Sequence, residues 1–289
     1  MEPLIPRDRL VEPSVPLPFG MVQSQETDGE RGKGENMDLG LKGRKAILAG
    51  ANASIGRAVA NVLAAEGCDI ALCGRTLSKV EAVVSEVTAL GVRGLGASVD
   101  VTDAGAFPDW VSGAAEALGG CDIFISFVSC NPGNDSPEAW QSVLSGDILP
   151  TVRGVQAALP ALLQSDAGAI VTISSTGALE EFMGPQPYNA LKAALINYSA
   201  ALAQKYAPQG LRVNCVSPGP IFTEDGPWAY IKENMGEFHD GIVKQIPFGR
   251  MGTGEELAKA IAFIASPTCR YMTGANVLID GGFTKGVQY

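Results

Sequence analysis

The sequence predicts a doubly wound α/β domain built on a seven-stranded parallel sheet. From Lys45 onward, short apolar runs alternate with longer amphipathic stretches. The short runs are apolar at successive positions, which is typical of strands that helices cover on both faces. Hydrophobic residues make up 46% of the chain and charged residues 18%, so most of it can form a core. We find no internal repeat, and we expect a single layered domain.

Seven apolar runs are expected to form the strands. In chain order they are residues 46–48, 70–73, 95–99, 123–128, 169–173, 213–216 and 277–279. Amphipathic stretches between the runs predict helices, most clearly at 55–65, 77–90, 140–163 and 188–206. In helix 77–90, apolar side chains recur every three or four residues and predict one buried face: Leu77, Val80, Val83, Val84 and Val87. Thr76 is placed to cap this helix.

Residues 1–36 differ in composition from the rest of the chain. Five prolines are followed by a polar stretch, residues 23–36, that has almost no apolar side chain. Such a composition cannot pack a core and predicts a flexible N-terminal extension. It lacks the apolar region of a secretory signal peptide, and its seven acidic residues argue against a transit peptide. The folded domain is therefore expected over residues 37–289.

The charge balance argues against several classes of partner. The formal net charge is −10 and the isoelectric point is near 4.7, so we expect no binding to nucleic acid or to an anionic membrane. No apolar run reaches the roughly 18 residues that a membrane helix needs. The six cysteines form no C-x-x-C pair and lie mostly in apolar runs, which predicts buried, reduced thiols in a cytoplasmic protein.

The chain contains one histidine, His239. A metal site built from several histidines is therefore excluded, and we expect no metal. A Ser-His-Asp triad would have to use His239, for which we expect a surface or lid position instead. Acid–base chemistry is then expected from Tyr, Lys, Asp, Glu or Cys side chains.

A glycine-rich turn joins the first predicted strand to the first helix. Gly50 allows a sharp turn, and Gly56 allows the helix to pack closely on the strand. Free N–H groups at the start of the helix form an anion site that suits a pyrophosphate, although a tight turn without a ligand can have the same composition. The residues predicted to bind a dinucleotide here are Gly50, Asn52, Ser54, Ile55 and Gly56.

The end of the second predicted strand favours NADP(H) over NAD(H). Proteins that bind NAD usually carry an acidic residue there for the ribose 2′-hydroxyl, whereas this chain has Gly74 followed by Arg75. A guanidinium can form two charge-assisted hydrogen bonds with a 2′-phosphate. The alternative is that Arg75 is an exposed loop cation. Asp100 and Val101, after the third strand, are placed where an adenine ring could lie.

Three residues that follow the fifth predicted strand form a candidate catalytic group. Tyr188 lies thirteen residues after Ser175, and Lys192 lies four residues further, on the same helix face. Tyrosine is a poor base at neutral pH, but a neighbouring ammonium stabilises the phenolate. Tyr188 can then exchange a proton with a substrate oxygen that Ser175 hydrogen-bonds. A Tyr-x-x-x-Lys pair alone is common in helices, and its combination with the serine and the glycine turn is far more specific.

Together these residues resemble the short-chain dehydrogenase/reductase family, from Leu41 to the C-terminus. Three further segments fit the resemblance: Arg212–Asn214, Thr273–Gly274 and Asp280–Gly282. The resemblance implies a Rossmann fold and a homotetramer or homodimer. It also implies contacts with the nicotinamide half of the cofactor by Pro218, Gly219, Ile221 and Thr223. The spacing of the tyrosine and lysine is similar to that of the carbonyl-reducing branches rather than the enoyl reductases.

The chain departs from the family pattern at two sites that are thought to bond to each other in the family. Ser54 replaces the middle glycine of the cofactor turn, and Ala49 replaces the threonine that usually precedes the turn. The strand-four asparagine motif reads Ser126 to Ser129 instead. In the family the threonine side is thought to bond across to the asparagine side, so the loss of both leaves no unpaired partner.

A third departure is Asp147, which stands where the family places a catalytic asparagine. We expect Asp147 to keep a helix kink and a water site there, and to add negative charge beside Lys192. An anion at this place stabilises the lysine ammonium but opposes a phenolate on Tyr188, so we predict a higher pH optimum for oxidation. The alternative is a surface position for Asp147.

The segment 222–245 is expected to form a lid over the substrate, as the resemblance implies. It is rich in aromatic, methionine and aliphatic side chains, namely Trp228, Tyr230, Ile231, Met235 and Phe238. Such a lining favours an apolar or aromatic carbonyl substrate. The alternative is a pair of helices that simply packs on the domain.

We therefore predict an NADP(H)-dependent oxidoreductase that interconverts a ketone or aldehyde and the corresponding alcohol by hydride transfer. Tyr188 is expected to donate the proton in reduction, Ser175 to hold the oxygen, and Lys192 to stabilise the phenolate and bind the nicotinamide ribose. Two alternatives remain open. One is an NAD-dependent alcohol dehydrogenase that works oxidatively, and the other is a nucleotide-binding pseudoenzyme.

Overall fold

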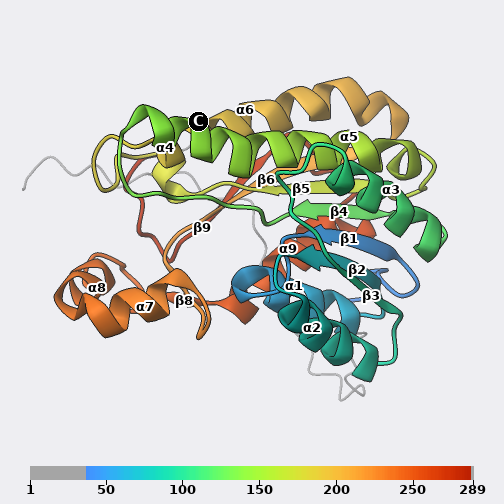
Figure 1. Cartoon of the computed structure of the whole chain (residues 1–289), viewed down its shortest axis with the longest axis horizontal. Coiled ribbons are helices and arrows are strands. Elements are labelled where there is room, and N and C mark those ends of the chain that lie inside the picture. Colours follow the sequence, from blue (N-terminus) through green and yellow to red (C-terminus); the bar gives the residue numbers. More distant parts are fainter. Residues whose placement is uncertain (1–36, 288–289) are drawn as a thin grey trace, which may run out of the picture. The chain divides into compact units, whose positions relative to one another are not determined.

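Seven parallel strands form the central sheet in the computed structural model, which describes residues 37–287 (Figure 1). Their order across the sheet is β3-β2-β1-β4-β5-β6-β9. The strands are β1 (Lys45–Ala49), β2 (Asp69–Gly74), β3 (Gly94–Ser98), β4 (Ile123–Ser126), β5 (Ala169–Ile173), β6 (Arg212–Pro218) and β9 (Asn276–Ile279). Each predicted apolar run coincides with one of these strands to within two residues at either end. The predicted fold class is confirmed.

Helices cover both faces of the sheet (Figure 1). They are α1 (Ser54–Ala65), α2 (Leu77–Ala89), α3 (Ala106–Leu118), α4 (Pro137–Val143), α5 (Leu149–Leu162), α6 (Pro187–Tyr206), α7 (Pro227–Asn234), α8 (Gly236–Val243) and α9 (Gly254–Ala265). Buried side chains of α1, α2 and α9 share one core with the sheet, and those of α3, α5 and α6 share the other. The N-terminal extension predicted for residues 1–36 lies outside the described residues.

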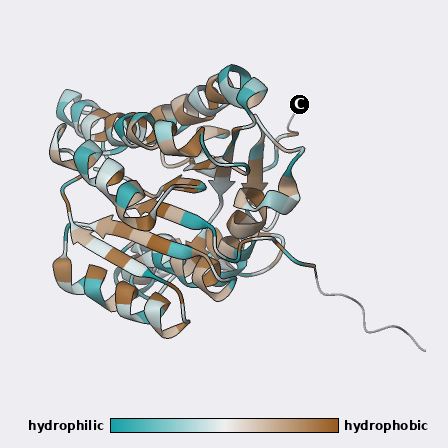
Figure 2. Ribbon diagram, turned by 90° about the vertical axis from the view of Figure 1, so that its right-hand side faces the viewer, coloured by the Kyte–Doolittle hydropathy of each residue, from teal (hydrophilic) through white to brown (hydrophobic). Residues whose placement is uncertain are grey.

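The alternation of side chains along each strand explains why the strands are apolar throughout. In β1, Ala46 and Leu48 point into the core under α1, α2 and α9, whereas Ile47 and Ala49 point into the opposite core. All four side chains are completely buried. Figure 2 shows the same arrangement across the sheet, with hydrophobic strands between helices whose outer surfaces carry the hydrophilic residues. A strand with two covered faces therefore has no polar position to show in its sequence.

The edges of the sheet and the start of α2 differ from the prediction. Strands β3 and β9 are only partly buried, because each has a neighbour on one side alone. Leu77 was expected in the buried face of α2 but is 51% exposed, and the buried residues of this helix begin only at Val80. Thr76 is the N-cap residue, yet its side chain makes no capping hydrogen bond.

The helix predicted over residues 140–163 is divided into three parts. Helix α4 ends at Val143, a π-helical turn occupies Leu144–Ile148, and α5 then begins at Leu149. Pro150 has no N–H to donate to the carbonyl four residues earlier, so the regular ladder is interrupted here. Such π turns are often found at functional sites. This one carries Asp147.

A second, two-stranded sheet precedes the last helix. Strand β7 (Ile221–Phe222) pairs in parallel with β8 (Gly252–Thr253). Helices α7 and α8 lie in the chain between these two strands, so the sheet closes the base of the segment predicted as a lid. Thr253 and Glu256 then form a reciprocal capping box at the start of α9.

The cysteines are mostly buried, as the sequence predicts. All six cysteines are free, and five of them are buried. Burial raises the pKa of the Cys73 and Cys121 thiols to about 12, so both stay neutral at physiological pH. Among residues 37–287, no helix is long and apolar enough to cross a membrane.

Helix α5 packs so closely on the sheet that a methyl group added at Gly154 should destabilise the domain. Gly154→Ala would place Cβ 2.6 Å from Cζ of Phe124 and 3.1 Å from Cζ of Phe107, so we expect a loss of about 1–3 kcal/mol of unfolding free energy. Urea denaturation measures this loss. Gly113→Ala is the matched control, because Gly113 in α3 has no neighbour within 4 Å of an added Cβ. This variant should be neutral or up to about 1 kcal/mol more stable, and equal losses in both variants would contradict the packing argument.

Candidate active site

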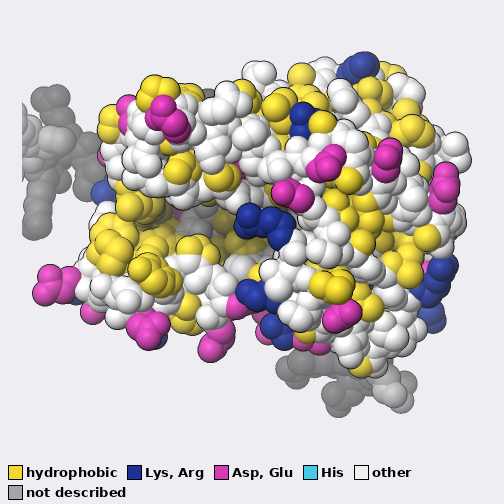
Figure 3. Space-filling view, viewed as in Figure 1, with side chains coloured by type: hydrophobic (Ala, Val, Ile, Leu, Met, Phe, Trp, Pro, Cys, Tyr) yellow, Lys and Arg dark blue, Asp and Glu magenta, His cyan; other side chains and the backbone are white. Residues whose placement is uncertain are grey.

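The candidate site lies where the parallel strands end. The chain winds from β1 outward to β3 and then returns to β4 on the other side of β1, which opens a crevice at the carboxyl edge of the sheet. Figure 3 shows a hollow between the α7–α8 part and the rest of the domain, with hydrophobic side chains on its walls and basic side chains at its inner end. Nearly all predicted cofactor and catalytic residues follow the ends of strands at this edge or lie at the start of α1 and α6.

Lys192 occupies the centre of the catalytic group. Its ammonium lies 5.6 Å from the centre of the Tyr188 ring and donates a hydrogen bond to the carbonyl of Ile173, at the end of β5, over 3.0 Å. The side chain is 2% exposed. Ser174 adds a second link, because its hydroxyl donates to the backbone carbonyl of Lys192. The end of β5 and the first turns of α6 are thereby held together.

Ser175 is held so that its hydroxyl hydrogen is free to point outward. Its oxygen accepts a hydrogen bond from the backbone N–H of Gly177, over 3.1 Å, in the short 3₁₀ turn Thr176–Ala178. The turn packs against α6 so closely that a Cβ on Gly177 would lie 2.5 Å from Oδ1 of Asn189, the residue after Tyr188. Both Ser175 and Tyr188 are half-buried, so a small molecule in the crevice can reach them.

Asp147 forms a buried ion pair with Lys192. Its two carboxylate oxygens lie 2.9 and 3.2 Å from the lysine Nζ, and its side chain has no exposed surface. The alternative of a surface position is therefore wrong. Burial raises the pKa of the Asp147 carboxyl above its usual value, and the nearby ammonium offsets only part of this effect. The π turn brings the carboxylate to this place.

Ser126, in the segment that stands in place of the strand-four asparagine motif, has a polar partner in α5. Ser126 is paired in register with Ala49 of β1, so no threonine faces it from that side. Its hydroxyl instead lies 2.8 Å from the hydroxyl of Thr151, which also donates to the backbone carbonyl of Asp147. The polar network at the end of β4 therefore joins this strand to α5, and it includes the backbone carbonyl of Asp147 in the π turn.

The glycine-rich turn has the geometry that a dinucleotide phosphate requires. Gly50 has a positive φ of 74°, and a Cβ on Gly56 would lie 2.6 Å from Cα of Ala51. Ser54 also has a positive φ, 51°, which side-chain-bearing residues seldom adopt. These features place the N-terminal N–H groups of α1 at the crevice, and together they fit a bound pyrophosphate. Ile55 follows in the first turn of this helix.

The end of β2 is shaped by Asn52. A Cβ on Gly74 would lie 2.2 Å from Cγ of Asn52, so no acidic side chain can stand at this position without moving the asparagine. Arg75 is exposed, and among residues 37–287 its guanidinium has no hydrogen bond or ion pair. Asp100 turns its carboxylate to the N–H and hydroxyl of Thr102, which lowers the pKa of that carboxyl, and Val101 is buried.

The residues predicted near the nicotinamide follow the end of β6. Pro218 is its last residue, and Gly219 lies so close to β9 that an added Cβ would be 2.5 Å from Cβ of Asp280. Ile221 is buried in β7, and the Thr223 hydroxyl lies 2.8 Å from that of Ser54. The structure thus brings Thr223 to the glycine-rich turn.

Two aromatic side chains of the predicted lid pack on each other. The rings of Trp228 in α7 and Phe238 in α8 stack with their centres 6.3 Å apart. Both pack against an apolar cluster that includes Ile246, together with Phe182 and Phe283. His239 bonds Asp240 and meets the edge of Trp228, and none of its contacts is with the catalytic group. Among the described residues, no cluster of His, Cys, Asp or Glu could hold a metal ion.

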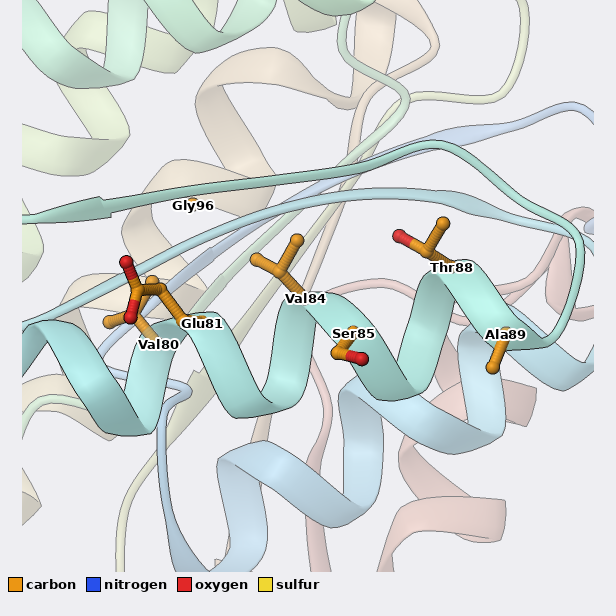
Figure 4. A pocket seen from close by; sticks show the side chains of 7 residues that line it. All are labelled: Val80, Glu81, Val84, Ser85, Thr88, Ala89 and Gly96. Atoms are coloured by element: carbon orange, nitrogen blue, oxygen red, sulfur yellow. The ribbon is translucent and has the colours of Figure 1, made fainter.

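A separate hollow of about 520 Å³ lies outside this crevice, between α2 and strand β3 (Figure 4). Its walls are mostly small or apolar, with Val80, Val84 and Gly96 at its base. It arises because Gly96 has no side chain, since a Cβ there would lie 2.5 Å from Val80. It contains none of the predicted site residues, and we assign it no role in the reaction.

Sequence reasoning missed Asp225. Its carboxylate accepts a hydrogen bond from the N–H of Ser54, at 3.0 and 3.1 Å for the two oxygens. The two residues are 171 positions apart. The one local sign was the absence of a capping side chain at the start of α1, where the N-cap is Ala53.

Known proteins are similar to this chain over most of its length. A family model described as enoyl-(acyl carrier protein) reductase matches residues 49–284. Isoepoxydon dehydrogenase of Aspergillus clavatus is 32% identical over 253 residues, which span 86% of this chain and 98% of that protein. Cyclohexanol dehydrogenase of a Rhodococcus species is 34% identical over 273 residues, covering 86% and 98% of the two chains.

Solved structures show the same fold. A short-chain dehydrogenase/reductase from Serratia marcescens is 32% identical, with a TM-score of 0.76 over 84% of this chain and 99% of that chain. L-sorbose reductase from Gluconobacter frateurii, solved with NADPH and L-sorbose, is 28% identical. Its TM-score is 0.80, over 87% of this chain and 100% of that chain.

The buried ion pair predicts a charge-dependent pH profile. The Asp147 carboxylate favours the Lys192 ammonium but repels a phenolate on Tyr188, so Asp147→Asn should shift the acid limb of kcat/KM for alcohol oxidation to lower pH, by about one unit. Ser126→Ala is the control, because it disturbs the same network without changing its charge. An unshifted profile in Asp147→Asn, or an equal shift in both variants, would contradict this role for Asp147.

Proposed function

Because the chain belongs to the short-chain dehydrogenase/reductase family, we propose that it is an NADP(H)-dependent oxidoreductase that interconverts a ketone or aldehyde and the corresponding alcohol. One observation carries the proposal. The Lys192 ammonium lies against the Tyr188 ring at the edge of an accessible crevice, with Ser175 on the adjoining turn. This arrangement can move a proton to or from a substrate oxygen without histidine.

Side chains of the protein bind the substrate oxygen and transfer a proton to it. The Ser175 hydroxyl donates a hydrogen bond to the substrate oxygen, because its own oxygen already accepts from Gly177. The phenol of Tyr188 donates its proton to that oxygen as carbonyl becomes alcohol, and the Lys192 ammonium stabilises the phenolate left behind. A nicotinamide held near Pro218 and Thr223 would supply the hydride when bound.

Three features around β2 support NADP(H) over NAD(H). Gly74 leaves no acid for a ribose 2′-hydroxyl, Asn52 fills the space beside it, and Arg75 has its guanidinium free among the described residues. The related L-sorbose reductase is described as a complex with NADPH. An NAD-dependent dehydrogenase that works oxidatively remains the alternative.

The substrate that fits the site best is an apolar or aromatic carbonyl compound or its alcohol. The apolar cluster around the α7–α8 segment includes the aromatic side chains of Phe182, Phe283 and Trp228, and these are only partly buried. By its name, the Rhodococcus relative acts on cyclohexanol, a ring alcohol with no further polar group. The three-residue interval between Tyr188 and Lys192 also favours carbonyl chemistry over enoyl reduction.

We also propose a cytoplasmic homotetramer or homodimer that binds neither nucleic acid nor membrane. Large apolar side chains outside the crevice support an interface between copies. Tyr271 is fully exposed before β9, and Phe248 is 76% exposed beside Gly281. Light scattering at several protein concentrations would measure the assembly.

A panel of carbonyl compounds and alcohols tests the activity directly. Turnover is followed by the absorbance of the reduced nicotinamide, with NADP(H) and NAD(H) in parallel. Tyr188→Phe should lower kcat by about 10²- to 10⁴-fold and leave cofactor binding nearly unchanged, because only the proton donor is removed. Tyr198→Phe, on the same helix, is the control and should keep full activity. Tight NADPH binding without any turnover across the panel would favour the pseudoenzyme.

A second variant tests cofactor choice. Arg75→Ala should lower kcat/KM for NADPH by about 10- to 100-fold and change that for NADH by less than about threefold, since one charge-assisted phosphate contact is lost. Arg93→Ala is the matched control, because Arg93 precedes β3 at the opposite edge of the sheet. Equal effects of Arg75→Ala on both cofactors would overturn the proposed preference.

A further inference from the structure

The N-terminus of α1 already holds an anion that belongs to the protein. Both carboxylate oxygens of Asp225 lie within 3.1 Å of the Ser54 N–H, the first N–H of the helix. Asp225 is exposed and stands just before α7. An exposed carboxylate gains from this position, because the positive end of the helix dipole and an otherwise free N–H both face it.

Helix α1 has no capping group of its own. Its N-cap residue is Ala53, whose side chain cannot accept a hydrogen bond, and its first turn contains no acidic residue. The hydrogen-bond acceptor for the Ser54 N–H is therefore supplied from a distant part of the chain. Asp225 is the side chain that provides it.

A second contact holds the same two segments together. The hydroxyls of Ser54 and Thr223 lie 2.8 Å apart, and this contact needs the side chain that Ser54 has in place of glycine. The turn after Thr223 is tight, since a Cβ on Gly226 would lie 2.2 Å from the Thr223 hydroxyl and 2.9 Å from that of Ser54.

We propose that Asp225 is an internal competitor of the cofactor pyrophosphate, and that the dinucleotide must displace its carboxylate from the N-terminus of α1 in order to bind. This inference rests on the proposed function, because it assumes a dinucleotide at the glycine-rich turn. The reason is electrostatic: two anions cannot share the same N–H group and the same helix end without strong repulsion.

Displacement also couples the cofactor to the lid. Asp225 lies between β7, which the pairing with β8 anchors, and α7, which begins two residues later at Pro227. Release of the carboxylate therefore frees the start of the α7–α8 segment while its base stays fixed. Asp225 thus lowers cofactor affinity and holds this segment in the free protein.

Direct binding measurements test the competition. NADPH is titrated into the full-length protein and followed by nucleotide fluorescence or calorimetry. Asp225→Asn removes the charge and should lower the Kd for NADPH by about two- to fivefold, the factor that corresponds to a helix-end charge interaction. Glu224→Gln is the matched control, because it removes the same charge one residue away, where no side-chain hydrogen bond is found in the described structure. Its Kd should stay within the error of the wild type.

Thermal unfolding gives a second readout that does not depend on turnover. Asp225→Ala removes the helix cap, so the free variant should melt about 1 to 4 °C below the wild type. With saturating NADPH the difference should disappear or reverse, because the wild type has then already lost the contact. A deficit that persists in the complex would show that Asp225 stays on α1 beside the cofactor, and would overturn the competition.

The outcomes separate this inference from the proposed function. A wild type that binds NADPH normally, with Asp225→Asn unchanged or weaker in affinity, overturns the role of Asp225 alone. A folded wild type that binds neither NADPH nor NADH overturns the proposed function and, with it, the competition. Tighter binding by Asp225→Asn together with an unchanged control supports both.

Discussion

The buried ion pair between Lys192 and Asp147 is the interaction on which the site depends. Both side chains are removed from water, and the loss of one partner from such a pair typically costs about 3–5 kcal/mol. Their positions fix three elements at once: the end of β5 through the Ile173 carbonyl, the first turns of α6, and the π turn that carries Asp147. The lysine ammonium that faces Tyr188 is thereby oriented by the core of the domain rather than by solvent.

The same pair shows how a changed residue can alter chemistry without altering the fold. Asp147 keeps the shape of the asparagine that the family resemblance implies at this position, but it adds a charge. Behind the turn, Ser126 and Thr151 form a neutral network in which both hydroxyls have hydrogen-bond partners. The charge lies beside the Lys192 ammonium, which is 5.6 Å from the centre of the Tyr188 ring.

The crevice also links two parts of the molecule that are separate in sequence. The glycine-rich turn belongs to the start of the chain's fold, whereas Thr223, Asp225 and the two helices after them come near its end. Aromatic side chains of α7 and α8 pack on one another, and the two helices lie in the chain between the paired strands β7 and β8, so this segment is a small structured unit. Its position can respond to what binds at α1.

The sequence by itself determined the sheet, most helices, the glycine-rich turn and the spacing of Tyr188 and Lys192, because these depend on local periodicity and on short intervals along one helix. It could not show that Leu77 is exposed or that β3 and β9 are half-covered, since edge positions follow from strand order. Only the family resemblance placed Asp147 beside Lys192, and nothing in the sequence placed Asp225 on α1. Those contacts join residues 45 and 171 positions apart, and only the tertiary structure, which brings strand ends and helix starts to one edge, decides them.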